Sequence, residues 1–202
     1  MTEPIQKAEA ADMKRQLVVS VFIALMLASV VSMTLLAQNP NPLRTVNGIA
    51  LSEFNGYDTW QTIAVSHPDK GGGCGSTKED CIKVILGNAA MVNAYKEGFP
   101  GNGKPAPDGA AMAKVEWNQK HNTSPYGITV PTVETGVAFM LKDSKRFTQT
   151  NGWGYAMFLR DAATDNFKTS TDDPAVMRTL CHSCHTSGAK ARDYVFTNYA
   201  KR

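Results

Sequence analysis

The sequence has little of several features that would assign it to a broad class of proteins. Its 202 residues include only four histidines and four cysteines, and Lys and Arg exceed Asp and Glu by only three. So small a positive surplus does not predict a nucleic-acid-binding protein. The chain also contains no internal repeat and no low-complexity tract, which excludes a solenoid or a fibrous protein.

Charge is absent altogether from residues 16–43, and 17 of the 21 residues from 17 to 37 are hydrophobic. At about 1.5 Å per residue, a helix of this length spans roughly 30 Å, the thickness of a bilayer core. Lys14 and Arg15 precede it, which favours a cytoplasmic N-terminus and export of the remainder to the periplasm. We expect residues 1–37 to be an uncleaved inner-membrane anchor or a signal peptide cleaved near Ala37.

The remainder of the chain has an ordinary soluble composition. We expect a short linker over residues 38–49 and one domain over residues 50–202. Period-two alternation of apolar residues predicts half-buried antiparallel strands near residues 111–117, 137–141 and 153–159.

Other spacings predict the remaining elements. Apolar residues at helical spacing favour helices over residues 52–67 and 189–200, and Asn88 would cap a third helix that runs to about Tyr95. A short strand is expected at residues 82–86, and loops are expected at residues 98–109 and 161–173. The fold class is therefore predicted to be α+β.

The first pair of cysteines, Cys74 and Cys81, encloses part of a glycine-rich polar loop. In an oxidising compartment the natural assignment is a disulfide. Closing so short a loop would contribute roughly 2–3 kcal/mol through the entropy of the unfolded chain. Metal binding together with His67 is the alternative, although the pair lacks the C-x-x-C spacing of common metal sites.

The second pair belongs to the motif Cys181-His182-Ser183-Cys184-His185, the C-x-x-C-H attachment signature of one c-type haem. Thiols three residues apart can reach the two vinyl groups of one porphyrin, and His185 would then supply the proximal imidazole to the iron. A redox C-x-x-C pair would favour a thioredoxin-like context, which the pattern lacks. A zinc site would require further ligands, and the only histidines outside the motif are His67 and His121.

The motif lies close to the C-terminal end, which narrows the kind of haem protein. The 17 residues after His185 contain neither Met nor His, so a sixth iron ligand would have to come from upstream. A simple electron carrier would need such a ligand, and Met112, Met140 and His121 are candidates. Without one, the iron keeps an open position at which small molecules bind or react.

Six stretches of the sequence resemble the cytochromes P-460 and their relatives, the cytochromes c-prime-beta. They occur in order over residues 50–202: 82–88, 107–117, 142–147, 151–156, 181–185 and 193–197. The resemblance implies an antiparallel β fold with flanking helices, a homodimer, and a haem c with His185 as proximal ligand.

The resemblance also implies a role for Lys114. In the cytochrome P-460 branch, a lysine on the strand after an Asp-Gly motif bonds to the porphyrin ring, and these enzymes oxidise hydroxylamine. From the residues alone, Lys114 shares a strand face with Met112 and Glu116, and a solvent-facing lysine is the simpler interpretation. Lys83 falls where the family can carry a basic residue beside the pocket.

The sequence departs from the family at one position. Members that oxidise hydroxylamine use a carboxylate over the open face of the haem to move protons. We expect it in the segment before the haem motif, but no acid stands near Ala175. Asp172 and Asp173 are the available substitutes, and each could instead cap a turn or a helix.

Three functions follow as hypotheses. The first is an oxidoreductase that acts on hydroxylamine or related nitrogen oxides and passes electrons to a partner cytochrome. The second is a nitric-oxide-binding haem protein of the c-prime-beta kind without turnover. The third is a simple electron carrier.

Overall fold

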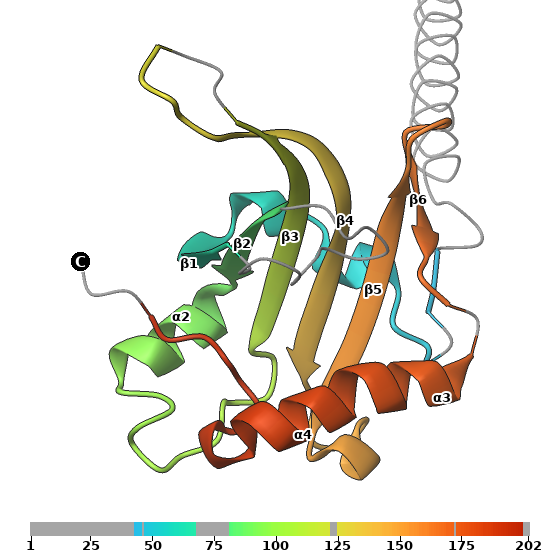
Figure 1. The fold of residues 1–202 in the computed structure, drawn as a ribbon. Coiled ribbons are helices and arrows are strands. Elements are labelled where there is room, and N and C mark those ends of the chain that lie inside the picture. Colours follow the sequence, from blue (N-terminus) through green and yellow to red (C-terminus); the bar gives the residue numbers. More distant parts are fainter. Residues whose placement is uncertain (1–42, 46, 68–80, 122–124, 172, 200–202) are drawn as a thin grey trace, which may run out of the picture. The chain divides into compact units, whose positions relative to one another are not determined.

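The computed structural model describes residues 43–45, 47–67, 81–121, 125–171 and 173–199 (Figure 1). The chain divides into two compact units, Met1–Pro42 and Leu43–Arg202, and all described residues belong to the second. The predicted membrane segment at residues 17–37 therefore lies outside the described residues. None of the helices within the described ranges has the length and apolar character needed to cross a membrane.

Six strands form one antiparallel sheet in which each strand pairs with the next along the chain. This arrangement, with helices beside it, confirms the α+β prediction (Figure 1). The strands are β1 Gln61–Ser66, β2 Cys81–Gly87, β3 Ala111–Lys120, β4 Val130–Lys142, β5 Trp153–Asp161 and β6 Asn166–Thr169.

Helical segments cover one face of the sheet. Helix α2, Ala89–Lys96, begins as predicted at Asn88, whose side chain accepts a hydrogen bond from the Met91 backbone nitrogen at 3.0 Å. A second, continuous helical run crosses the ends of the central strands in Figure 1. It consists of α3 Pro174–Val176, the π-helix η4 Met177–His182, α4 Ser183–Ala189 and the 3-10 turn η5 Lys190–Arg192.

The predicted helix over residues 52–67 is wrong. Two 3-10 turns, η1 Leu51–Phe54 and η2 Tyr57–Thr59, are followed by β1. Gly56 between the turns has φ +78°, outside the helical region. The segment after it is rich in β-branched residues, which favour a strand once β2 is available for pairing.

Two predictions near the C-terminus also differ from the structure. The expected loop at residues 161–173 contains β6, which pairs with β5 through a turn at Asp165. The expected helix over residues 189–200 is wrong, because the helical run already ends at Arg192. Asp193 and Tyr194 then adopt left-handed backbone angles that no helix accommodates, and residues 195–199 continue without a helix.

Both faces of the central strands are covered. The alternation in β3 predicted a half-buried strand, but residues on both of its faces are buried. On one face, Ile85, Met112 and Tyr155 pack with α2 and the C-terminal segment. On the other face, Val115, Phe139 and Phe158 pack with residues that precede β1. These include Ile49, which is fully buried, so the end of the predicted linker at residues 43–49 lies within the compact unit.

Candidate functional site

A cavity of about 630 Å³ opens between the helix-covered face of the sheet and the C-terminal part of the chain. Strands β1 to β5 form one wall, and the helical run with residues 195–198 forms the other. Four residues singled out by the sequence line it together: Lys114, Cys181, Cys184 and His185. Residues separated by about 70 positions in the sequence thus share one chamber.

The helical run places both cysteines of the motif at this cavity. Cys181 lies in the π-helix η4 and Cys184 in the first turn of α4, and both carry free thiols. Residues three apart on a helix lie on neighbouring positions of one face, so the two thiols can reach one ligand. Cys184 is exposed, whereas burial raises the pKa of the partly buried Cys181 thiol.

His185 is oriented by a backbone carbonyl. Its Nδ1 donates a hydrogen bond to the Tyr194 carbonyl oxygen at 2.6 Å, which leaves Nε2 as the nitrogen with a free lone pair. The ring also contacts those of Tyr155 and Phe196, at centroid distances of 5.1 and 4.8 Å. Burial lowers the pKa of the imidazole, so the neutral form that binds metals is favoured.

Lys114 is paired with a buried carboxylate. Its Nζ lies 2.8 Å from Oε1 of Glu116, whose side chain is only 3% exposed. The cross-strand partner of Glu116 is Lys83, which also lines the cavity. Burial, followed by the nearby positive charge of Lys114, lowers the pKa of the Lys83 amine. Sequence reasoning placed Glu116 on the right strand face but assigned it no role; its spacing of two residues from Lys114 was the available signal.

Of the two acidic substitutes only Asp173 is described, and it does not line this cavity. Asp173 is exposed, and its carboxylate accepts a hydrogen bond from the Ala175 backbone nitrogen at 2.8 Å, as a helix cap does. Asp172 lies outside the described residues. Among the described residues that line the cavity there is no carboxylate.

Methionines occupy the sheet wall instead. Met112, Met140 and Met157 all line the cavity, and Met112 and Met140 are direct cross-strand partners. Sequence reasoning named the first two and missed Met157. His121, the third suggested upstream ligand, does not line the cavity; its Nδ1 lies 2.8 Å from the hydroxyl of Thr129.

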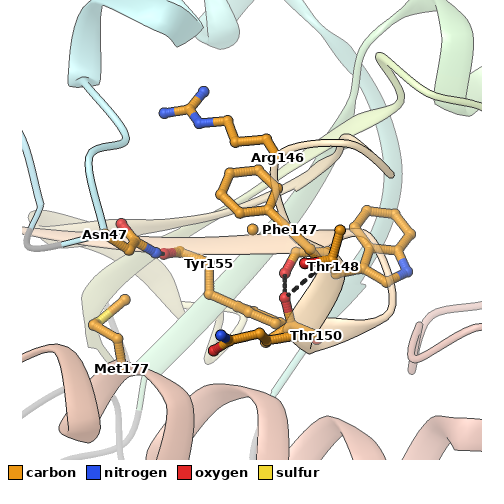
Figure 2. Close-up of a pocket in the computed structure, with 10 residues that line it drawn as sticks. Asn47, Arg146, Phe147, Thr148, Thr150, Tyr155 and Met177 are labelled. Atoms are coloured by element: carbon orange, nitrogen blue, oxygen red, sulfur yellow. Dashed lines mark hydrogen bonds between the residues drawn. The ribbon is translucent and has the colours of Figure 1, made fainter.

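A second, smaller cavity of about 240 Å³ shares Tyr155 with the first. Figure 2 shows Asn47, Phe147 and Met177 around it, with the Thr150 hydroxyl bonded to nearby backbone carbonyls. It contains none of the cysteine, histidine, lysine or aspartate residues that the sequence named as candidate site residues. The larger cavity is therefore the candidate site.

The predicted disulfide stays a prediction. Cys81, the first residue of β2, is fully buried, but Cys74 lies outside the described residues.

The family model for Cytochrome P-460 matches residues 54–197. The chain belongs to the cytochrome P-460 family. The matched range contains all six strands of the sheet and the whole C-x-x-C-H motif, so it confirms the resemblance stated from the sequence. A search of the curated proteins finds no match.

Family membership makes this chain a haem cytochrome, and the cavity fits a haem. Two free thiols and an imidazole with one nitrogen already hydrogen-bonded face a space walled largely by apolar side chains. These are the groups that c-type haem attachment and axial ligation require.

Proposed function

We propose that this chain is an exported mono-haem c-type cytochrome that binds hydroxylamine or a related nitrogen oxide and oxidises hydroxylamine. The observation that carries the proposal is the single cavity lined by Lys114, Cys181, Cys184 and His185. The bound haem supplies an iron that binds the nitrogen of the ligand and accepts its electrons. A partner cytochrome then takes the electrons away.

Each of these residues has a part in holding the cofactor. The Cys181 and Cys184 thiols form thioether bonds to the porphyrin, and His185 presents Nε2 to the iron. Lys114 would be the residue whose amine is joined to the ring, as the resemblance to the cytochrome P-460 branch implies. Oε1 of Glu116, 2.8 Å from Nζ of Lys114, would hold this amine in place. Met112, Met140 and Met157 would give the sheet side of the haem cavity an apolar surface.

A second function, nitric oxide binding without turnover, is favoured by one specific observation. The described lining of the cavity contains three methionines and no carboxylate that could accept protons from hydroxylamine. Nitric oxide needs no such group to bind. Catalysis and gas binding therefore share the same cavity and differ in whether protons can leave it.

An absorption spectrum of the reduced, mature protein tests the cross-link, because the bond to the ring shifts the main band strongly to the red. Lys114→Arg keeps a positive charge beside Glu116 but should lose this shift. Lys120→Arg, at the exposed end of the same strand, is the matched control and should keep it. Mass spectrometry of the tryptic haem peptides should recover Lys114 joined to the haem; recovery of unmodified Lys114 would contradict the assignment.

Two further measurements separate the functions. Hydroxylamine-dependent reduction of an added electron acceptor identifies the oxidoreductase, whereas nitric oxide binding without this activity identifies the gas-binding protein. A low-spin, six-coordinate spectrum that ignores nitric oxide would identify an electron carrier, with Met112 or Met140 as the sulfur ligand to test first.

The homodimer and the membrane attachment are part of the same proposal. Light scattering after size exclusion should give twice the mass of the mature chain. Fractionation of the producing cells should place the haem in the periplasm or on the inner membrane, according to whether residues 1–37 are removed.

A further inference from the structure

Lys142, the last residue of β4, is buried outside the cavity. Its side chain is 7% exposed, and its Nζ donates hydrogen bonds to both carboxylate oxygens of Asp193 at 3.1 Å and to the Asn151 carbonyl at 3.0 Å. The ammonium also lies 4.9 Å from the ring centroid of Trp153. A buried lysine with this many partners is held in one position, and so is the carboxylate that it binds.

Asp193 is held from a second side as well. Its Oδ2 accepts a hydrogen bond from the Ala106 backbone nitrogen at 2.8 Å, so three separate parts of the chain meet at one carboxylate. The side chain of Asp193 is 15% exposed. Both contacts are long-range, and together they fix the point at which the helical run ends.

At that point the backbone adopts an unusual conformation. Asp193 and Tyr194 have φ values of +49° and +65°, two consecutive residues in the left-handed region without a glycine. Each such residue costs of order 1–3 kcal/mol and persists only where its surroundings hold it. The Tyr194 nitrogen donates to the Ala189 carbonyl at 2.8 Å, which closes the turn.

This turn aims the Tyr194 carbonyl at His185. The resulting hydrogen bond from Nδ1, at 2.6 Å, is the short contact that selects Nε2 for the iron. The residue that supplies the carbonyl is the direct neighbour of the residue that Lys142 holds. A chain of contacts therefore runs from a buried lysine on β4, through the left-handed turn, to the proximal imidazole.

We propose that Lys142 and Asp193 are positioning residues that set the strength of the hydrogen bond to the proximal histidine. The inference rests on the proposed role of His185 as iron ligand. A strong acceptor at Nδ1–H makes the imidazole more electron-rich, which stabilises ferric over ferrous iron. The ion pair thus holds the midpoint potential of the haem low, although neither residue lines the cavity.

The test measures the potential of the mature holoprotein in Asp193→Asn and Lys142→Met. Both variants break the ion pair that helps to hold the turn, so the midpoint potential should rise, by about 59 mV for each tenfold loss of preference for ferric iron. The iron–imidazole stretching frequency of the ferrous form, measured by resonance Raman, should fall. Lys142→Arg keeps the charge and should stay close to the wild-type potential.

A purely structural ion pair predicts a different outcome. Glu134→Gln breaks the ion pair between Glu134 on β4 and Arg160 on β5, whose side chains are 17% and 25% exposed. This pair lies away from His185. This control should lower stability without moving the potential. If Asp193→Asn behaves in the same way, or if Lys142→Arg shifts the potential as far as Lys142→Met, the inference is overturned.

The same experiment distinguishes failure of the underlying assignment. If His185→Ala retains the wild-type spectrum, His185 is not the iron ligand and the proposed function itself is wrong. If that variant loses the native spectrum while Asp193→Asn leaves potential and stretching frequency unchanged, only the positioning role fails.

Discussion

Lys114 and Glu116, two residues apart on β3, form an ion pair at 2.8 Å in which the lysine is 41% exposed and the carboxylate 3% exposed. The pair therefore has one end in the wall of the sheet and the other at the cavity. Lys83, which faces Glu116 from β2, adds a second cation to the same carboxylate. The chemistry proposed for Lys114 thus depends on a neighbour that does not itself line the cavity.

Glu116→Gln should destabilise the protein by about 1–3 kcal/mol, because the change leaves cations beside an uncharged buried group. This free energy lies between the values for breaking an exposed ion pair and a buried one. It should also lower the pKa of Lys83 further, since the charge of Glu116 opposes the effects of burial and of Lys114. Urea unfolding and NMR titration of the lysine amines measure the two effects. Glu97→Gln, at the exposed end of α2, is the control; equal effects of both changes would contradict the prediction.

Replacement of both Cys181 and Cys184 by serine should leave any bound haem extractable by acidified organic solvent. Each thiol forms one thioether bond in the proposed attachment, so either single variant should retain the haem through the other bond. Extraction followed by measurement of haem in the two phases decides the matter. Haem that stays with the doubly substituted protein would mean that the C-x-x-C-H motif is not the attachment site.

Gly136→Ala should destabilise the sheet by about 1–3 kcal/mol through overpacking. A Cβ atom at Gly136 would lie 2.6 Å from the Phe158 carbonyl oxygen of the neighbouring strand, and this backbone atom cannot move aside cheaply. Gly101→Ala, where the nearest atom is a carbonyl oxygen at 3.5 Å, is the control and should change stability little. Thermal unfolding of both variants compares them; a Gly136→Ala protein as stable as the control would show that β4 and β5 can separate locally.

Tyr57→Phe should reduce the loss of stability in alkali. Burial of Tyr57, with the nearby charge of Glu134, raises the pKa of its phenol from 10.0 to about 12. The folded state therefore holds this proton more tightly than the unfolded state does. The resulting stability is fully present below pH 10 and is lost as the pH rises towards about 12.

Unfolding free energies of the wild type and Tyr57→Phe across that range provide the measurement, with tyrosinate absorbance as a direct titration. The difference between the two proteins should be constant below pH 10 and narrow above it. A difference that is independent of pH would contradict the raised pKa.

Short-range patterns were sufficient for the middle of the sheet. The alternation around residues 111–117 and 153–159 predicted β3 and β5, and Asn88 predicted the start of α2. The motif at residues 181–185 predicted three of the residues that line the cavity. It could do so because haem attachment itself requires this spacing of the cysteines and the histidine. Lys114 came from the family resemblance, since a lysine on a strand carries no local signal of what it faces.

The failures have a common physical cause in long-range contacts. Residues 61–66 become a strand because β2 offers a partner. The helix expected over residues 189–200 is cut short at Asp193, whose left-handed backbone is held by Lys142 and Ala106 from distant parts of the chain. The spacing of two residues indicated that Glu116 could reach Lys114, but only the strand register shows that Lys83 faces the same carboxylate.

The order of elements along the chain divides the cavity between an early and a late part of the sequence. All six strands end by Thr169, before the first residue of the haem motif. Met112, Met140 and Met157 therefore all precede the attachment cysteines in the chain, and the sheet side of the cavity is built without the segment that carries the motif. The opposite side of the cavity, together with the Tyr194 carbonyl that meets the His185 imidazole, comes from residues 180–198.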